Sequence, residues 1–391
     1  MTAAQRPIAV IHNRYLQSGG EDAAVTAQLR LLGANGVAVA RFETSNAELL
    51  KMGDIARAAT TVWNASAGRD FQAFLAREKP RVAHFHNTFP LLSPAVYAAA
   101  RREGIPVVQS LHNYRLVCPN ALLFRDGQPC NACLEKRVKW PSVQHACYRG
   151  SRTATAVTAG MLAVHEMKGT WKNSVDVYLA LTEFARRKFI AGGIRAEKIV
   201  LNPSFLAEDP GRGNHAGGFG LFVGRLSPEK GVGTMLDAWR IAGGRGRTLK
   251  IAGTGPLDES LDHSLPGVEW LGQRSNDEVL ALMRDAAFLV FPSECYEAFP
   301  VTLVEAFATG LPVLASNLGA MAEIVEHGRT GHLFAPRDPA ALAHAIDWAF
   351  SKPCDLGALG AAGRTEYEAK YTAEQAFDRL SHIYMKAEAT A

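Results

Sequence analysis

No run of apolar residues in this 391-residue sequence is long enough to cross a lipid bilayer. The longest apolar stretches, such as 155–164 and 286–291, fall well short of the roughly 20 residues that a membrane-spanning helix needs. Near the start, the apolar residues 8–11 are too few for the core of a secretory signal peptide, and no small-residue cleavage site follows them. The sequence therefore predicts a cytoplasmic protein without a transmembrane helix.

Low-complexity tracts and short-period repeats are also missing, and 20% of the residues are charged while 48% are hydrophobic. This composition is typical of a globular protein, so it excludes a disordered, collagen-like or coiled-coil chain. A chain of 391 residues is longer than one hydrophobic core usually supports. With roughly 150 residues per domain as a guide, the length predicts two domains.

The overall charge of +4 conceals a difference between two parts of the sequence. Residues 1–205 hold 26 Lys and Arg against 14 Asp and Glu, a net charge of +12, whereas the remainder carries −8. Such a basic part is typical of a protein that meets an anionic membrane or acceptor, and solvated basic faces without a partner are the alternative. The basic residues are scattered and lack interleaved aromatic residues, so nucleic acid is not an expected partner.

Short apolar runs typical of buried strands alternate with helical patterns along the chain. The sequence predicts strands at 8–11, 37–40, 82–85, 107–111 and 177–180, and helices at 22–32, 71–77 and 94–102. A second series of strands is predicted at 220–223, 248–252, 288–291 and 312–315. This alternation predicts an α/β protein with two doubly wound parallel sheets and a cleft between the two domains.

Composition also suggests where the domains begin and end. Residues 207–218 are rich in glycine and lack periodicity, which indicates a linker. We therefore expect an N-terminal domain at 1–206 with a cysteine-containing insert at about 118–152, and a C-terminal domain at 219–370. Residues 371–391 are expected to form a C-terminal helix that crosses back to the first domain.

Residues 292–312 combine the end of a predicted strand, a polar loop and a helix. The loop carries Glu297, Pro300 suits the first turn of the helix, and Gly310 suits its end. The N-terminal end of such a helix favours an anion, and Glu297 and Glu305 can accept hydrogen bonds from sugar or ribose hydroxyls. Alternatively, Glu297 caps the helix and Glu305 is a surface residue.

The segment from Glu297 to Glu305 resembles the E-x7-E signature of retaining GT-B glycosyltransferases, and its surroundings are similar to glycosyltransferase family 4. Residues 222–231, which carry Arg225 and Lys230, resemble the diphosphate-binding segment of that family. The resemblance covers about 8–385 and implies two Rossmann-like domains that face a central cleft, with the second domain binding the donor. Arg225 and Lys230 would then stabilise the charge of the departing diphosphate, so no metal cofactor is expected for catalysis.

Several glycine-containing turns resemble donor-binding loops of the same family. In 18–21, Gly19 and Gly20 would let the backbone approach the donor phosphates. Ala298 and Pro300 stand where many family members have glycine, and the proline removes one backbone donor. The donor-binding residues that the resemblance implies are Gly19, Gly20, Gly224, Gly253, Gly255, Leu271, Gly272, Ala298, Phe299, Pro300, Val301 and Glu305.

Histidine and asparagine follow two predicted strands of the first half. His112 resembles the family position whose histidine lies beside the transferred sugar, so it joins Arg225, Lys230 and Glu297 as an expected catalytic residue. The expected acceptor-side residues are His86, Asn87, Asn113 and Arg115.

Four of the six cysteines lie in the insert with the spacing C-x11-C-x2-C-x13-C. A reducing compartment disfavours disulfides, which leaves a structural zinc site or unliganded thiols. The candidate zinc ligands are Cys118, Cys130, Cys133 and Cys147. The insert also carries basic and aromatic residues, which suit a membrane interface or a pyrophosphate-lipid acceptor.

Together with the resemblance, these features predict a retaining glycosyltransferase that uses a nucleoside diphosphate sugar, a UDP- or GDP-sugar. The expected acceptor is a hydroxyl of a lipid-linked or polysaccharide substrate at the inner face of the membrane. A nucleotide-sugar epimerase of the same architecture and a non-catalytic nucleotide-sugar-binding subunit are the alternatives. The presence of Arg225, Lys230, Glu297 and Glu305 together favours transfer.

Overall fold

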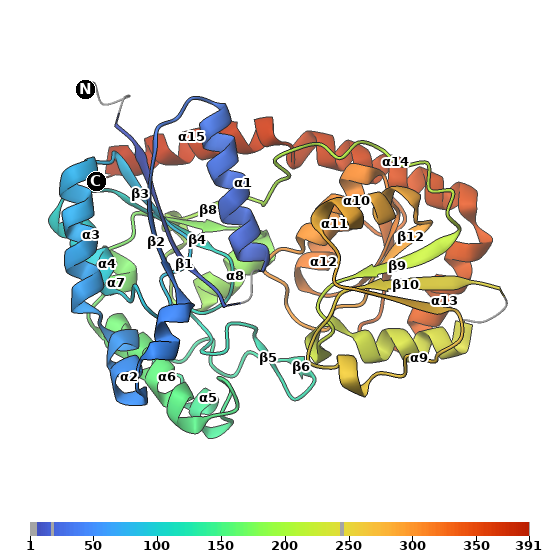
Figure 1. Ribbon diagram of the computed structural model, residues 1–391, viewed down its shortest axis with the longest axis horizontal. Coiled ribbons are helices and arrows are strands. Elements are labelled where there is room, and N and C mark those ends of the chain that lie inside the picture. The colour runs from blue at the N-terminus through green and yellow to red at the C-terminus, as the bar shows by residue number, and fades with distance from the viewer. Residues whose placement is uncertain (1–5, 17–18, 243–245, 391) are drawn as a thin grey trace. The chain divides into compact units, whose positions relative to one another are not determined.

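The computed structural model describes residues 6–16, 19–242 and 246–390, which divide into two units (Figure 1). The first unit comprises the described residues of 1–123, 130–207 and 373–391, and the second comprises 124–129 and the described residues of 208–372. Residues 207–218 contain no helix or strand. Within the described ranges, the helices are too short or too polar for any of them to cross a bilayer.

The first unit is built on a six-stranded, all-parallel sheet with the strand order β2-β1-β3-β4-β7-β8. Its strands are β1 (Ile8–Arg14), β2 (Val39–Ser45), β3 (Val82–Phe85), β4 (Val107–Leu111), β7 (Val177–Ala180) and β8 (Ile199–Leu201). The predicted end of the second strand at residue 40 is wrong, because β2 pairs with β1 as far as Ser45. As an edge strand, β2 carries polar residues that gave no apolar run.

Helices connect these strands and cover both faces of the sheet. They are α1 (Gly20–Ala34), α2 (Asp54–Val62), α3 (Ala65–Glu78), α4 (Ala95–Arg102), α5 (Trp140–Gln144), α6 (Arg152–Met167), α7 (Thr170–Asn173), α8 (Glu183–Ala191) and α15 (Ala373–Thr390). Two 3-10 helices, η2 (Asn46–Lys51) and η3 (Ala196–Lys198), complete the unit. Figure 1 shows α1 beside α15, which comes from the opposite end of the chain.

Successive residues of β3 show which helices cover each face. His84 is hydrogen-bonded to Gln28 of α1 and Tyr384 of α15. The next residue, Phe85, packs its ring against Phe71 of α3 at 5.6 Å and also lies against α4. Because side chains alternate along a strand, α1 and α15 cover one face of the sheet, and α3 and α4 cover the other.

The second unit repeats this plan with the strand order β11-β10-β9-β12-β13-β14, again all parallel. Its strands are β9 (Phe219–Val223), β10 (Thr248–Ala252), β11 (Val268–Gly272), β12 (Phe288–Phe291), β13 (Val313–Ser316) and β14 (Gly331–Phe334), and a short antiparallel pair is formed by β5 (Phe124–Arg125) and β6 (Gln128–Pro129). Two doubly wound parallel sheets were expected from the sequence, and this prediction is confirmed.

Helices also pack against the second sheet. They are η4 (Pro228–Lys230), α9 (Val232–Ala242), η5 (Asp258–Ser260), α10 (Asn276–Asp285), α11 (Val301–Thr309), α12 (Gly319–Ile324), α13 (Pro339–Ser351) and α14 (Pro353–Lys370). α9 and α13 share a buried apolar cluster that includes Trp239 and Ile346. α14 packs closely on α11, because a Cβ at Gly360 would lie 2.1 Å from the carbonyl oxygen of Gly310.

The strand order reverses once in each sheet. In the first sheet this happens between β1 and β3, and in the second it happens between β9 and β12. All strands are parallel, so their carboxyl ends lie along one edge of each sheet. Ligands of open α/β sheets bind outside the carboxyl ends of the strands at this reversal, so the loops after β1, β3, β9 and β12 are the places to look for a site.

Candidate functional site

Lys230 and Glu297 meet at the strand reversal of the second unit. Lys230 ends η4, which follows β9, and Glu297 lies in the loop after β12. The Nζ of Lys230 is 2.6 Å from Oε1 of Glu297, and the Ser293 hydroxyl donates to the same oxygen at 2.6 Å. Burial lowers the pKa of Lys230, but the charge and hydrogen bond of Glu297, together with the neighbouring Cys295 and Glu229, outweigh burial and raise the pKa above its ordinary value. Lys230 is therefore a charged group at neutral pH.

A second, partly buried ion pair joins Arg225 to Glu229, the residue directly before Lys230. Nη2 of Arg225 is 2.5 Å from Oε1 of Glu229, and the Ser227 hydroxyl donates to that oxygen at 2.8 Å. Burial raises the pKa of Glu229, yet these hydrogen bonds and the Arg225 charge hold it below its ordinary value. The Arg225 side chain is 56% exposed whereas that of Glu229 is 9% exposed, so Glu229 holds a guanidinium that solvent can reach.

Three glycines tie the loops after β9, β10 and β11 together. The Gly224 N–H donates to the Ala252 carbonyl at 3.1 Å, and the Gly253 N–H donates to the Gly272 carbonyl at 2.8 Å. At Gly253 the φ angle is +149° and a Cβ would lie 1.9 Å from the Gly224 carbonyl oxygen, so only glycine fits. A Cβ at Gly255 would likewise meet the Leu226 backbone at 2.4 Å. These loops are held close to one another by backbone contacts.

The helix predicted to begin at Pro300 begins one residue later. Pro300 is the N-cap residue of α11, Val301 is its first residue, and Gly310 with φ +73° ends it. The half-buried Glu305 lies in this helix, and burial raises the pKa of its carboxyl to about 7. Ala298 and Phe299 lie in the loop before the helix, and Leu271 lies in β11.

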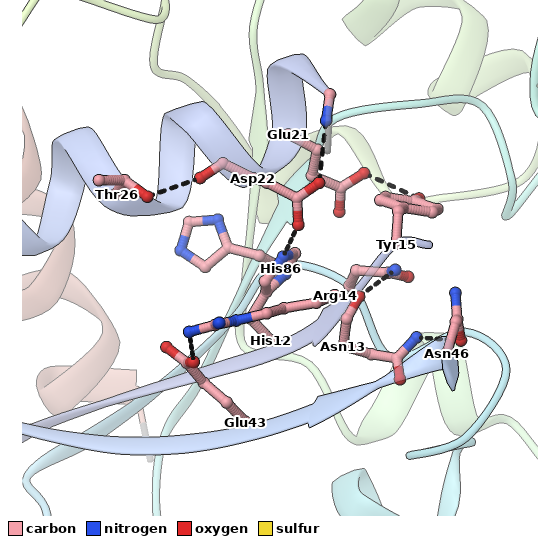
Figure 2. A network of polar contacts seen from close by, with 12 residues as sticks. His12, Asn13, Arg14, Tyr15, Glu21, Asp22, Thr26, Glu43, Asn46 and His86 are labelled. Carbon is pink, nitrogen blue, oxygen red and sulfur yellow. Dashed lines mark hydrogen bonds and ion pairs between the residues drawn. The ribbon is translucent and has the colours of Figure 1, made fainter. Parts of the chain in front are cut away.

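The equivalent loops of the first unit hold a separate polar network (Figure 2). Nε2 of His12 at the end of β1 lies 2.8 Å from Oδ1 of Asp22 in α1. The other oxygen of Asp22 accepts the Gly19 N–H at 3.0 Å, which holds the start of α1. No described atom lies within 4 Å of where a Cβ would stand at Gly19 or Gly20, whereas Ser18 lies outside the described residues.

Glu21 is held beside this pair by two neutral donors. The Tyr15 hydroxyl donates to its Oε2 at 3.0 Å, and the side-chain amide of Asn113 donates to the same oxygen at 3.2 Å. Burial and the neighbouring Asp22 raise the pKa of Glu21 while these two hydrogen bonds oppose the shift, and the resulting pKa is about 7. Glu21 therefore titrates near neutral pH.

Three histidines stack in the same unit. The rings of His84 and His86 lie 4.5 Å apart, and those of His86 and His112 lie 5.1 Å apart with a 2.8 Å contact between His86 Nδ1 and His112 Nε2. Burial lowers the pKa of His112 to about 4 and that of His84 to about 3. All three imidazoles are therefore neutral at physiological pH, and His84 is a core residue between Tyr384 and Ser110.

The expected acceptor-side residues have different surroundings. Asn87 lies in the loop after β3 and connects that loop to β1, because its side-chain amide donates to the Asn13 carbonyl at 2.8 Å. Arg115 lies over the Phe89 ring at 4.4 Å and donates to the Pro119 carbonyl. Asn113 and His112, in contrast, join the network of Glu21 and His86.

Four buried atoms of this network have no hydrogen-bond partner among the described residues: His12 Nδ1, Asn13 Oδ1, Glu21 Oε1 and His86 Nε2. They belong to the end of β1, to the residue that follows β3 and to the start of α1. Buried polar groups are almost always hydrogen-bonded, so atoms left over at one place indicate a polar ligand there. Carboxylate, amide and imidazole atoms together suit the hydroxyls of a sugar.

The four insert cysteines do not form a zinc site in the structure. Among the described residues, no group of three or more His, Cys, Asp or Glu is arranged to hold a metal ion. The thiol of Cys118 donates to Asn120 Oδ1 at 2.9 Å, and that of Cys133 lies 3.9 Å from the Lys139 carbonyl oxygen. None of these four cysteines forms a disulfide.

The sequence did not mark several residues of these networks. The structure shows five such residues in contact with predicted ones: Glu229, Ser293, Tyr15, Glu21 and Asp22. One signal was available, because Glu21 and Asp22 directly follow Gly19 and Gly20. Glu229 and Ser293 each lie four positions from the predicted residue that they bind, whereas Tyr15 meets Asn113 from 98 positions away.

Two family models match this chain. Residues 219–352 match the model described as glycosyl transferases group 1, and residues 14–204 match the model described as a glycosyl transferase 4-like domain.

Among curated proteins, a glycogen synthase of Mycobacterium tuberculosis is 34% identical over 175 residues, which cover 43% of this chain and 42% of the relative. The D-rhamnosyltransferase WbpZ of Pseudomonas aeruginosa is 32% identical over 162 residues, which cover 40% and 42%. The matched region thus spans less than half the length of these relatives.

Solved structures match over nearly the whole chain. Sucrose-phosphate synthase from Thermosynechococcus elongatus has a TM-score of 0.72 at 18% identity and covers 99% of this chain and 100% of its own. Anabaena HepE in complex with UDP-glucose has a TM-score of 0.68 at 17% identity, with coverage of 96% and 98%. These similarities confirm the GT-B fold.

Proposed function

The chain belongs to the group 1 glycosyl transferases of family 4, and from this membership we propose that it transfers a sugar from a nucleoside diphosphate sugar to an acceptor hydroxyl. The observation that carries the proposal is the cluster at the strand reversal of the second unit. There Arg225 and Lys230 are held by Glu229 and Glu297, and the three glycine loops lie beside them. Retention of the anomeric configuration rests on the family alone.

In the proposed reaction, Arg225 and Lys230 bind the diphosphate. The glycosidic bond breaks with its electron pair going to the diphosphate oxygen, so negative charge grows there. Two fixed cations stabilise that charge more in the transition state than in the bound substrate, which speeds the reaction. The acceptor oxygen then forms the new bond to the anomeric carbon, and its proton leaves with the departing phosphate.

Glu297 has a second part in this scheme. Its Oε1 binds Lys230 and Ser293. When the diphosphate forms an ion pair with Lys230, the Glu297 carboxylate can accept hydrogen bonds from sugar hydroxyls instead. Glu305 on α11 is the proposed partner of the ribose hydroxyls, because its carboxyl is half-buried.

We assign the acceptor side to the first unit. The unpaired atoms of Glu21, His12 and His86 suit sugar hydroxyls, and His112 is proposed to contact the transferred sugar as a neutral imidazole. The charge of +12 on residues 1–205 supports a lipid-linked or polysaccharide acceptor at the inner face of a membrane. The exposed Val138 and Trp140 in the basic insert support peripheral contact with anionic lipid.

UDP is the first nucleotide to test, because HepE was crystallised with UDP-glucose. Thermal unfolding is measured with UDP, GDP, ADP and dTDP for the wild type, Arg225→Ala, Lys230→Ala and the control Lys250→Ala. Lys250 lies in β10 of the same unit and pairs with Glu269 at 3.6 Å, outside the cluster. We expect one nucleotide to raise the midpoint of the wild type and the control but not that of the two cluster variants.

The matching nucleotide sugar is then incubated with the protein and with candidate acceptors. Release of nucleoside diphosphate with a glycosylated product supports transfer. An epimerised nucleotide sugar supports the epimerase instead, and donor binding without turnover supports a non-catalytic subunit. If no nucleotide shifts the midpoint, or if the cluster variants respond like the wild type, the proposed donor site is wrong.

A further inference from the structure

A cavity of about 220 Å³ lies in the first unit, beside the insert and away from the networks described above. Its walls come from the loop before α5, from α6 and α7, and from the end of α8. The charged residues that line it are Glu135, Lys136, Arg137, Lys139, Glu166 and Lys172. Four cations against two carboxylates give the cavity a net charge of +2.

Lys139 is the unusual member of this set. The residue is 5% exposed, and among the described residues its Nζ donates to two carbonyl oxygens alone, those of Cys133 at 3.0 Å and Leu134 at 3.4 Å. No carboxylate of the described residues is within ion-pair distance of it. A buried ammonium without a counter-charge is costly, and the cost falls when an anion enters beside it.

Of the three other cations, Lys136 and Arg137 have no counter-charge among the described residues. Lys172 is paired with Glu166 at 3.3 Å. The exposed side chains of Lys136 and Arg137 form no hydrogen bond or ion pair with any described residue, and the exposed Glu135 is the one carboxylate that remains. A smaller cavity of about 20 Å³ shares the Lys172 and Glu166 wall and continues to Arg195 and Lys198, which adds two more cations.

We propose that this cavity is a phosphate-binding site, with the Lys139 ammonium at its floor and Lys136 and Arg137 at its mouth. A phosphate monoester carries about −1.5 to −2 charges near pH 7, which matches the net charge of the lining. A carboxylate would balance only half of it. The fork of Arg137 suits two phosphate oxygens, and Lys136 supplies a compact charge to a third.

The volume of the cavity limits the size of the ligand that it can bind. Pockets for drug-sized ligands start near ~300 Å³, so this cavity accepts a small group rather than a whole nucleotide sugar. Trp171, which is 8% exposed, forms an apolar wall. The phosphate is therefore carried either by a small soluble ester or by a lipid head group, with Val138 and Trp140 exposed directly after the cationic residues at the mouth.

Binding of inorganic phosphate is measured by titration calorimetry at constant ionic strength. The Lys230→Ala background is used throughout, because the donor cluster of the second unit would also attract phosphate. The test variant is the double substitution Lys136→Ala and Arg137→Ala, which alters exposed side chains only. The control is Arg149→Ala with Lys168→Ala, which removes the same charge from exposed positions of the same unit outside the cavity.

We expect saturable phosphate binding that the test variant weakens by about tenfold or more and that the control leaves within twofold. Lys139→Met should lose the binding while unfolding at the same or a higher temperature without phosphate, since it removes an unpaired buried charge. Absence of saturable binding overturns the proposal. So does binding that the test variant and the control change equally.

Two further arms separate the sources of the phosphate. Glycerol 1-phosphate is titrated in place of inorganic phosphate, and sedimentation is measured with phosphatidylcholine vesicles with and without phosphatidic acid. Binding to glycerol 1-phosphate alone identifies a soluble ester. Sedimentation that needs both phosphatidic acid and the intact Lys136 and Arg137 identifies a lipid head group.

Discussion

Lys230 and Glu297 are 67 positions apart in sequence, yet their side chains form an ion pair of 2.6 Å at the point where the second sheet reverses its strand order. β9 and β12 are neighbours in the sheet, so residues that follow these strands must meet. The pair keeps a lysine charged in a half-buried place and holds it ready for an anion. The Glu297 carboxylate thus places a negative charge beside the Lys230 ammonium, as a bound phosphate would.

This relationship predicts non-additive stability effects. Lys230→Met and Glu297→Gln should each lower the free energy of unfolding by about 1–3 kcal/mol, because each leaves one partner without its counter-charge. The double variant should lose less than the sum of the two. Urea unfolding of the nucleotide-free protein measures all three values.

Lys250→Met provides the matched control. Its pair with Glu269 is longer, at 3.6 Å, and the Glu269 side chain is 53% exposed. Exposed ion pairs contribute about 0–1 kcal/mol, so this variant should change stability little. Strictly additive effects of Lys230→Met and Glu297→Gln would show that the ion pair does not couple the two residues.

Two neighbouring glycines should respond in opposite ways to alanine. At Gly231 the φ angle is +68° and a Cβ would lie 2.0 Å from the Pro292 carbonyl oxygen, whereas at Gly233 in α9 no atom lies within 4 Å. Gly231→Ala should destabilise the protein by more than about 2 kcal/mol, and Gly233→Ala should stabilise it by up to about 1 kcal/mol. Thermal and urea unfolding give both values, and equal losses would mean that the Gly231 turn can relax.

The sequence predicted the central strands better than the edge strands. β1, β3, β4, β9 and β12 are buried on both faces, so each contains a continuous apolar run. The strands that were missed or cut short include the four at the sheet edges, β2, β8, β11 and β14. These edge strands are half-exposed and mix polar with apolar residues, so no local pattern separates them from loops. The central β1 was also cut short, because the polar residues 12–14 follow its apolar run.

For the candidate site, sequence could point to residues but not to their partners. Glu297 and Lys230 follow predicted strands, and a parallel sheet puts such residues at one edge. No sequence pattern points to Glu229, because its contribution comes from being buried while it forms an ion pair with Arg225. The cysteine spacing suggested zinc, but spacing along the chain does not fix where the sulfurs point.

Glu21 should make stability depend on pH. Its carboxyl ionises near pH 7 in the folded protein and near its ordinary value of 4.5 in the unfolded chain. Between these values unfolding releases a proton, so the free energy of unfolding falls as pH rises from about 4.5 to 7. Glu21→Gln should remove about 1–3 kcal/mol of this fall, measured by urea unfolding at several pH values.

The control for this experiment is Glu197→Gln, an exposed glutamate of the same unit. It should leave the pH dependence as in the wild type. Other buried groups also titrate, Glu305 among them, so the comparison is the difference between variant and wild type at each pH. A Glu21→Gln curve parallel to that of the wild type would show that Glu21 ionises normally.

Glu305 should make the affinity for the donor rise with pH, whereas Glu21 makes the free energy of unfolding fall with pH. Its carboxyl titrates near pH 7 because it is buried, and hydroxyls of a bound nucleotide sugar would donate to the ionised form. Affinity should therefore rise as pH rises through about 7, with a dissociation constant about tenfold larger at pH 6 than at pH 8. A nucleotide sugar suits this test better than a nucleoside diphosphate, whose terminal phosphate titrates in the same range.

Glu305→Gln should bind the nucleotide sugar more weakly at pH 8, and its dissociation constant should not change with pH. Glu259→Gln, an exposed control in the same unit, should keep the wild-type pH dependence. A wild-type dissociation constant that is flat between pH 6 and pH 8 would mean that Glu305 does not hold the donor.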